Sequence, residues 1–412
     1  MSNSTTAPLL DQKTIDTVKA TVPVLAQHGE TITSRFYQMM FENHPELKNI
    51  FNQTNQRKGK QPQALANTVY AAASYIDNLE AILPVVKQIA HKHRSLNILP
   101  EHYPIVGKHL LLAMKDVLGD AATDEILDAW GKAYQVIADI FIQVEKEMYQ
   151  ETENKDGGWT GYRNFKIVDK VVESDVITSF YLKPIDGGKL PSYLPGQYIT
   201  VKMDRENAPY NCLRQYSLSC KPNPEFFRIS VKREDEINDN PSGIVSNFLH
   251  KDLSIGETLP VSAPAGDFTL NSEKKTLILI SGGVGITPLT SMLETVVTEQ
   301  PNRDVYFIHA AQHGGVHGLK SSIKDVVDHH KQVRSFVVYE QPSEEDRAEK
   351  TFDKEGFVDL DWLKTILPTN DASFYFCGPE GFMKAINKAL TTWGVDQEDI
   401  HFEFFGPTGS LD

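Results

Sequence analysis

One histidine in the N-terminal third of the chain stands where it could bind a metal. Apolar residues recur at helical spacing through Ile82, Val86 and Ile89, and His93 continues the same face of that helix. A histidine aimed into a helical core can bind iron through a neutral ring nitrogen. The alternative is a core histidine that only makes a hydrogen bond, and the helix by itself favours that alternative.

Other side chains near the N-terminus favour a ligand-binding pocket. Tyr37 lies on an expected helix, Phe51 lies at a turn after Pro45, and Gln61 and Leu65 share a helical face one turn apart. A phenol can stabilise dioxygen bound at iron, where partial negative charge develops. An all-helical domain with one inward histidine, a corner phenylalanine and a tyrosine–glutamine pair resembles a globin that holds haem.

A glycine-rich segment in the second half of the chain has the character of a phosphate-binding turn. The segment SGGVGITP, from Ser281 to Pro288, follows the apolar run TLILI. Gly282, Gly283 and Gly285 permit tight backbone turns, and the start of the following helix favours a phosphate group. The segment departs from the spacing G-x-G-x-x-G, so it is not the fingerprint of the commonest dehydrogenases.

The elements that must position these residues divide the chain into three regions. Apolar residues at helical spacing predict an all-α domain over residues 1–149. The polar stretch QETENKDGGWTG predicts a linker over residues 150–160. Alternating residues predict short strands over residues 161–271. Compact apolar strands separated by helical stretches predict a mainly parallel α/β sheet over residues 272–412.

Within the first region, punctuation residues predict where the helices begin and end. Gly29 is expected to end the first helix, and Pro45 is expected to end the second. Thr123 is expected to cap the last and longest helix, with Asp124 and Glu125 at the positive end of its dipole.

Composition limits the class of protein. A chain of 412 residues predicts two or three domains, and a net charge of −14 makes nucleic acid or an anionic membrane a poor partner. Cys212, Cys220 and Cys377 match no metal-ligand spacing and are too few for a disulfide framework. No segment approaches ~18 uninterrupted apolar residues, and the first ten residues lack the pattern of a leader. We therefore expect a cytoplasmic protein that is not embedded in a membrane.

Five segments of the helical region resemble the globin domain of bacterial flavohaemoglobins. They are RFYQMMF (35–41), NHPELKNIFN (43–52), NQRKGKQPQAL (55–65), IAHKHRSLNILPEHYPIVGKHL (89–110) and LDAWGKAY (127–134). The resemblance implies a haem b domain in which His93 is the proximal iron ligand and Phe51 packs on the porphyrin. It also implies that Tyr37 and Gln61 line the distal pocket with Leu65, and that the tyrosine hydroxyl donates to bound dioxygen.

On the proximal side, the resemblance pairs His93 with Tyr103 and Glu145. A carboxylate that accepts the imidazole N–H raises the basicity of the ring and pushes electron density toward the iron, as in peroxidases. From the sequence alone, Glu145 is more simply a solvated residue of the last helix. The role of Glu145 therefore depends on the resemblance.

The strand-rich region resembles the antiparallel flavin-binding barrel of the ferredoxin-reductase superfamily. Four segments carry this resemblance: PGQY (195–198), RQYS (214–217), SGIVSNFLH (242–250) and APAGDF (263–268). It implies an FAD whose pyrophosphate pairs with Arg214, whose ribityl chain or ring packs on Tyr216, and whose adenine side lies near Tyr198. The other residues implied at the FAD site are Gln215, Ser217, Gly243, Val245 and Ser246.

The segments FYFCGPEGFM (374–383) and HFEFFGP (401–407) resemble the pyridine-nucleotide half of the same superfamily. This resemblance implies that NAD(P)H binds with Cys377 and Gly378 beside the nicotinamide, and that Phe405 covers the flavin. Lys92 and Glu403 are expected to tune the two redox centres. The remaining expected cofactor-site residues are Gly283, Val284, Gly285, Ile286, Thr287, Pro288, Phe404, Gly406 and Pro407.

The order of the three regions makes the chain similar to flavohaemoglobins along its whole length. The resemblance implies a nitric oxide dioxygenase in which NAD(P)H reduces FAD, FAD reduces haem, and haem-bound dioxygen converts nitric oxide to nitrate. The implied substrates are O2 and nitric oxide, and no obligate protein partner is expected.

Two alternatives to this enzyme stay open. One is an oxygen-binding or sensing globin with a maintenance reductase, and the other is a haem-dependent peroxide reductase. The fused reductase favours the dioxygenase, because a storage protein needs reduction only rarely. The residues after His309 favour neither NADH nor NADPH, and a distal pocket of Leu65 and aromatic residues leaves a lipid ligand open.

Overall fold

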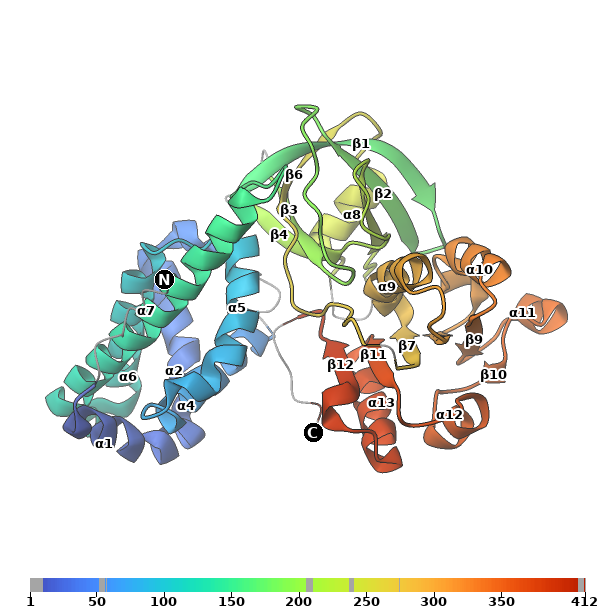
Figure 1. The fold of residues 1–412 in the computed structure, drawn as a ribbon. Coiled ribbons are helices and arrows are strands. Elements are labelled where there is room, and N and C mark those ends of the chain that lie inside the picture. Colours follow the sequence, from blue (N-terminus) through green and yellow to red (C-terminus); the bar gives the residue numbers. More distant parts are fainter. Residues whose placement is uncertain are drawn as a thin grey trace. The chain divides into compact units, whose positions relative to one another are not determined.

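The computed structural model describes residues 10–51, 56, 58–204, 210–236, 241–273, 275–406 and 411 (Figure 1). The chain divides into two compact units. The first contains Met1–Asn154 and Met203–Leu213, and the second contains Lys155–Lys202 and Arg214–Asp412.

The N-terminal part of the first unit, up to Asn154, is built from helices, as predicted for this region. The Thr123 hydroxyl accepts a hydrogen bond from the Ile126 N–H at 3.3 Å, and Asp124 and Glu125 occupy the first turn of the last helix, so the predicted cap is confirmed. The helices are α1 (Gln12–Ala20), α2 (Val22–Asn43), η1 (Pro45–Asn49), α4 (Lys60–Ser74), η2 (Leu79–Ile82), α5 (Leu83–Ser95), α6 (His102–Leu118), η3 (Gly119–Ala121) and α7 (Asp124–Asn154).

Two of the expected helix ends are wrong. Gly29 lies inside α2, and the break between the first two helices falls at Thr21 instead. Pro23 explains the position of the break, because proline lacks an N–H and fits well in the first turn of a helix. A single glycine costs a helix only about 1 kcal/mol, which packing overcomes. At the other end of the domain, α7 runs to Asn154, so residues 150–154 of the expected linker are helical.

The flavin-type region forms one antiparallel sheet of six strands in the order β4-β3-β6-β1-β2-β5. Leu218, directly after β4, forms a bridge to Ile229 of β5, which joins the two edges and closes the predicted barrel. α8 (Ile244–Lys251) packs against β5. The strands are β1 (Tyr162–Val172), β2 (Ile177–Pro184), β3 (Tyr198–Met203), β4 (Cys212–Ser217), β5 (Phe227–Lys232) and β6 (Thr258–Ser262).

The C-terminal region forms a parallel sheet in the order β10-β9-β8-β7-β11-β12. Its strands are β7 (Leu277–Gly282), β8 (Val305–Ala311), β9 (Val333–Tyr339), β10 (Lys354–Glu355), β11 (Ser373–Cys377) and β12 (Ile400–Glu403). Its helices are η4 (Gly283–Gly285), α9 (Ile286–Glu299), η5 (Gly314–Val316), α10 (Lys320–His329), α11 (Glu344–Glu349), α12 (Leu360–Ile366), α13 (Glu380–Trp393) and η6 (Gln397–Asp399).

Helices cover both faces of this parallel sheet. α9 and α10 pack on the face that carries Leu277 and Leu279, and α12 and α13 pack on the face that carries Ile278 and Ile280. Because both faces are buried, the central strands read as continuous apolar runs rather than as alternating ones. Among the helices that the structure describes, none is long and apolar enough to span a bilayer.

Candidate functional site

His93 lies in the last turn of α5, and side chains from two other helices hold its ring. The Nδ1 atom of His93 lies 2.7 Å from Glu145 Oε1 on α7 and 3.2 Å from the Tyr103 hydroxyl on α6. The Tyr103 hydroxyl donates to the same Glu145 oxygen at 2.5 Å. An ionised carboxylate only accepts hydrogen bonds, so the hydrogen bond to Glu145 requires the imidazole proton on Nδ1. The structure therefore brings together the three residues that the resemblance pairs on the proximal side.

This hydrogen bond leaves the second ring nitrogen of His93 available. Among the described residues Nε2 has no hydrogen-bond partner, and 31% of the His93 side chain is exposed, against 3% for Glu145. Burial and the charge of Glu145 raise the pKa of Tyr103, so its hydroxyl keeps its proton. A neutral imidazole nitrogen with a buried carboxylate behind it suits an iron ligand.

Tyr37 lies on α2 in an aromatic environment. Its ring centroid is 5.8 Å from that of Phe41 and 5.5 Å from that of Phe51. The side chains of Gln61, on α4, and of Gln56 act on its hydroxyl and lower its pKa, but burial outweighs their effect. Burial raises the pKa of Tyr37, so the phenol stays protonated and can donate. The expected Tyr37–Gln61 pair is in contact, and Gln56 joins it.

The buried apolar side chains of the helical unit form two clusters, one around Tyr37 and one beside His93. Phe51 and Leu65 pack with the cluster that contains Tyr37. Tyr103 and Phe141 belong to the other cluster, and the Phe141 ring centroid lies 5.8 Å from that of His93. Three partly buried residues contact both clusters: Leu79, Tyr134 and Ile137.

β4 presents the arginine and tyrosine of RQYS together. Arg214 and Tyr216 alternate onto one face, and the positive charge of Arg214 acts on the Tyr216 hydroxyl. Burial raises the pKa of Tyr216, and the arginine charge opposes that rise. Gln215 instead donates to Thr200 Oγ1 on β3 at 3.2 Å, so its side chain joins two strands. Arg214 and Tyr216 are therefore the pair placed for a phosphate and an aromatic ring.

The other expected flavin-site residues lie near this strand. Ser217 and Tyr198 are buried in the sheet. At the start of α8, the Ser246 hydroxyl donates to the Gly243 carbonyl at 3.3 Å and accepts from the Glu234 N–H at 3.2 Å. Val245 is buried, so both of these α8 side chains serve the fold. What this helix start offers to a phosphate is its backbone N–H groups.

The glycines of the turn after β7 serve two purposes: Gly285 allows close packing, and Gly283 leaves room for a ligand. A Cβ added at Gly285 would lie 2.1 Å from the carbonyl oxygen of Cys377, so no side chain fits there. Gly283 has a φ of 53°, and a Cβ added there would meet no atom within 4 Å. The Thr287 hydroxyl donates to the Val284 carbonyl at 3.1 Å and closes the turn. The backbone of Gly283 and Val284 is therefore the part that a nucleotide phosphate can approach. The other side chains of the turn are buried: Ile286, Thr287 and Pro288.

The expected nicotinamide-side residues lie at the carboxyl end of the sheet. Cys377 ends β11 and is buried, and burial raises the pKa of its thiol well above its ordinary value. Phe404 packs into the core beneath the sheet, whereas Phe405 is half exposed and can cover a ligand. Gly378 follows Cys377, and Gly406 follows Phe405. Pro407, also expected here, lies outside the described residues.

The two expected redox-tuning residues lie in different units. Lys92 directly precedes His93 on α5. Glu403 lies on β12 in register with Cys377 of β11. Their redox role stays a prediction.

A buried histidine pair near the nucleotide turn was missed at the sequence level. The Ser281 hydroxyl of β7 lies 2.8 Å from His309 Nδ1 on β8, and the His309 ring centroid is 4.2 Å from that of His317. Burial lowers the pKa of His309 to about 3, so this ring is neutral near pH 7. The run HAAQHGGVH has no helical or strand period that would identify these histidines, and Gln56 likewise lies in a polar stretch without a signal.

Comparisons of sequence with known proteins agree with this division. The Globin family matches residues 34–141, and the Oxidoreductase NAD-binding domain family matches residues 279–388. The chain is 59% identical to the Flavohemoprotein of Bacillus cereus over 404 residues, which is 98% of this chain and 100% of that protein. It is 52% identical to the Flavohemoprotein of Bacillus subtilis over 404 residues, which is 98% of this chain and 99% of that protein.

Solved structures show the same similarity. A flavohemoglobin from Malassezia yamatoensis with bound FAD and heme is 26% identical, with a TM-score of 0.83, over 96% of this chain and 100% of that chain. The Flavohem-like FAD/NAD binding domain of nitric oxide dioxygenase from Vibrio cholerae is 39% identical, with a TM-score of 0.55, over 60% of this chain and 99% of that chain.

Proposed function

The chain belongs to the flavohemoprotein family, and from that premise we propose that this NAD(P)H-dependent oxidoreductase is a nitric oxide dioxygenase. Each turnover combines one nitric oxide, one dioxygen and one electron to give nitrate. Haem supplies the iron at which dioxygen binds, and FAD divides the electron pair of NAD(P)H into single electrons. One observation carries the proposal: the carboxylate-backed His93 and a nucleotide-binding reductase occur in one chain. The fusion gives one reductase for each haem. This ratio suits a reaction that oxidises the iron at every turnover.

In this proposal the residues of the helical unit hold and tune the haem. His93 would bind the iron through Nε2, and Glu145, which holds the imidazole proton on Nδ1, would make the ring a stronger electron donor. Tyr37, which burial keeps protonated, would supply a hydrogen-bond donor for dioxygen. The Malassezia yamatoensis protein, solved with FAD and heme, supports the assignment of both cofactors.

In the reductase, each motif has a separate task. Arg214 and Tyr216 hold the FAD pyrophosphate and the flavin-side ring or ribityl chain, and the start of α8 adds backbone N–H groups. The backbone of Gly283 and Val284 holds the nucleotide phosphates. Cys377 and Gly378 border the nicotinamide, and Phe405 covers the flavin.

The direct test of this function adds nitric oxide to aerobic holoprotein with NADH. We expect rapid NADH oxidation and nitrate formation in proportion to the nitric oxide consumed. An oxygen-binding or sensing globin would instead give only slow NADH oxidation and no more than about one nitrate per haem. That result would remove the dioxygenase proposal.

A second candidate, a haem-dependent peroxide reductase, is favoured by the same proximal hydrogen bond. The 2.7 Å contact between Glu145 and His93 is of the kind that assists O–O cleavage in peroxidases. Adding hydrogen peroxide without nitric oxide separates the two functions. NADH oxidation faster with peroxide than with nitric oxide would favour this candidate.

The first predicted variant, Tyr37→Phe, tests the distal hydrogen bond. The change removes a hydroxyl and leaves the ring, so it deletes a donor worth about 1.5–3 kcal/mol to a charged acceptor. We expect dioxygen to dissociate roughly tenfold faster or more, because ~1.4 kcal/mol corresponds to one decade in rate. Laser photolysis or stopped-flow mixing measures this rate. Tyr70→Phe, at an exposed position of α4, is the matched control. An unchanged rate in Tyr37→Phe would show that the hydroxyl does not contact the ligand.

The second predicted variant, Lys92→Ala, tests redox tuning beside His93. We expect slower haem reduction by NADH and an unchanged rate of FAD reduction, because the nicotinamide site lies in the other unit. Anaerobic stopped-flow spectroscopy resolves the two phases by their absorbance. Lys87→Ala, at an exposed position of the same helix, controls for general effects of charge. Glu403→Ala tests the second expected residue; because Glu403 lies beside Cys377, its haem-reduction rate is compared with the flavin-reduction rate of the same variant. Wild-type haem rates in both variants would refute the tuning role.

A further inference from the structure

Helix α9 is the one element that continues from the glycine turn and also contacts the flavin motifs within the described second unit. Its first residue, Ile286, directly follows Gly285. Glu294 lies eight residues further along, about 12 Å from the helix start. The segment that faces it begins at Leu218, directly after the RQYS residues of β4. α9 therefore continues directly from the glycine turn, and the segment that it contacts continues directly from the RQYS motif.

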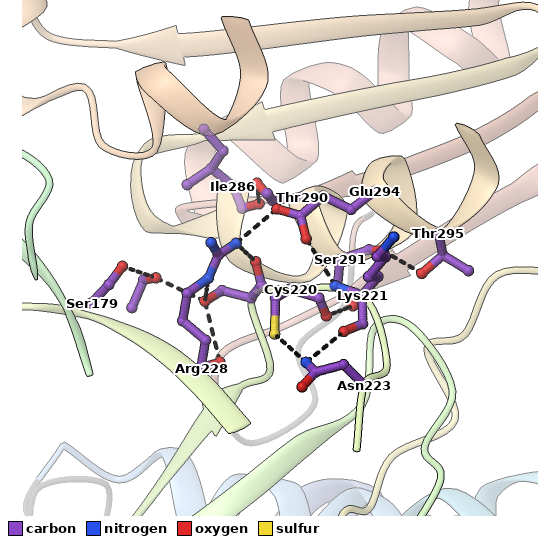
Figure 2. A network of polar contacts seen from close by, with 12 residues as sticks. Ser179, Cys220, Lys221, Asn223, Arg228, Ile286, Thr290, Ser291, Glu294 and Thr295 are labelled. Atoms are coloured by element: carbon purple, nitrogen blue, oxygen red, sulfur yellow. Dashed lines mark hydrogen bonds and ion pairs between the residues drawn. The ribbon is translucent and has the colours of Figure 1, made fainter. Parts of the chain in front are cut away.

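Two hydrogen bonds, one of them buried, join α9 to this segment (Figure 2). The Ser291 hydroxyl donates to the Cys220 carbonyl at 2.6 Å. The Lys221 N–H donates to Glu294 Oε2 at 2.9 Å. The Tyr193 hydroxyl donates to the same Cys220 carbonyl at 2.8 Å, which ties the segment to the rest of the barrel.

Arg228 completes the junction from the barrel side (Figure 2). Its Nη2 donates to Glu294 Oε1 at 2.9 Å and also to the Ser219 carbonyl, and its Nε donates to the Ser219 hydroxyl at 3.2 Å. The backbone of Arg228 accepts a hydrogen bond from the Ser219 N–H at 2.8 Å, at the seam where the barrel closes. Only 8% of the Arg228 side chain and 18% of the Glu294 side chain are exposed. Both oxygens of Glu294 are thus engaged, one by each partner.

A second contact links α9 to the other flavin motif. Met292 lies against Gly196 of the PGQY turn, where a Cβ would come within 2.7 Å of the methionine Cε. Met292 also belongs to the same apolar cluster as Phe268, which closes the APAGDF segment. The apolar contact of Met292 tolerates a lateral shift of α9. The ion pair between Arg228 and Glu294 does not, because hydrogen bonds between guanidinium and carboxylate groups require a fixed geometry.

We propose that Arg228 and Glu294 are positioning residues for hydride transfer, because their ion pair fixes α9 and the nucleotide turn against the flavin-binding strand. A buried ion pair is costly to desolvate, and an apolar pair of similar volume would serve stability as well. The ion pair is therefore better explained as a device that aligns α9 with the barrel than as a source of folding stability.

This inference rests on the proposed function in one respect: NAD(P)H must reduce FAD. In that step a hydride, which carries two electrons and one proton, leaves the dihydronicotinamide and gives NAD(P)+. The flavin accepts the hydride and becomes the reduced anion. Reactants of this kind must approach within about 3–3.5 Å, and a displacement of about 1 Å can cost on the order of a hundredfold in rate.

The test compares Glu294→Gln, Arg228→Met and the double variant with wild type, each loaded with FAD. Glu294→Gln keeps the shape of the side chain but turns one of its two acceptors into a donor, facing Lys221 or Arg228. With saturating NADH and no oxygen, we expect flavin reduction to slow about tenfold to a hundredfold in each variant. We also expect a weaker long-wavelength charge-transfer absorbance between nicotinamide and flavin. The FAD content should stay at the wild-type level, since neither residue belongs to the expected FAD contacts.

Arg347→Met is the matched control. Arg347 forms a bidentate pair with Glu355 at 2.5 and 2.7 Å in the same sheet domain, but both side chains are about half exposed. This variant should leave flavin reduction and the charge-transfer absorbance unchanged. Because the two residues act as one unit, the double variant should be no slower than the slower single variant.

Wild-type reduction rates and charge-transfer absorbance in a Glu294→Gln variant that retains FAD would overturn the positioning role. Slow reduction with an undiminished charge-transfer band would also overturn it, because alignment would then be intact. If Arg228→Met does not fold, Glu294→Gln alone decides the matter. Failure of the wild type to form nitrate would count against the proposed function only, because flavin reduction by NADH is measured without nitric oxide.

Discussion

His93→Ala should yield protein that carries FAD but almost no haem. The substitution removes the only nitrogen expected to bind the iron, and nothing in an alanine side chain can replace it. The chain should still reduce FAD with NADH, because the flavin and nucleotide motifs lie in the other unit. Visible absorbance and cofactor release measure both contents, with one haem and one FAD expected per wild-type chain.

His91→Ala is the matched control for this variant. His91 lies two residues before His93 on α5, about 200° away around the helix, so it is directed elsewhere. This control should retain haem with a wild-type spectrum. An unchanged spectrum of the ferrous–dioxygen form in His93→Ala would contradict the proximal assignment.

Gly285→Ala should abolish reduction of FAD by NADH and lower the stability of the parallel-sheet domain. The new methyl group would lie 2.1 Å from the carbonyl oxygen of Cys377, which belongs to backbone and cannot rotate away. The turn and the end of β11 would have to separate, and overpacking of this kind typically costs about 1–3 kcal/mol. The same separation would displace the nucleotide turn. Anaerobic stopped-flow reduction and thermal unfolding measure the two effects.

Gly381→Ala is the control for this substitution. Gly381 lies in the first turn of α13, and a Cβ added there would meet no atom within 4 Å. This control should reduce FAD at the wild-type rate and should be at least as stable as wild type, since alanine favours helix. A Gly285→Ala variant with wild-type stability and flavin reduction would show that the turn does not press on Cys377.

The sequence by itself determined the local structure of this protein and the positions of its motifs. The helical period of the first region and the apolar runs TLILI and SFYFC predicted the elements, because burial on one face or two faces leaves a direct periodic trace. The same period directed His93 inward. The sequence did not predict the break at Thr21, because glycine is the stronger signal for a helix end and Gly29 lies nearby. The packed helix α2 accommodates Gly29 in its interior.

Only the tertiary structure decided which distant residues meet. Glu145 has the sequence context of a solvated helical residue, and it is buried because α7 packs so that it reaches a histidine 52 residues earlier. Arg228 and Glu294 carry no motif, yet they pair across 66 residues where the barrel closes beside α9. Periodicity shows on which face of its own helix or strand a residue lies. Along a helix it relates that residue only to others three or four positions away. The partner of a residue in another element depends on how the elements pack. This packing places the carboxylate of Glu145 against His93 and presses the turn at Gly285 against the end of β11.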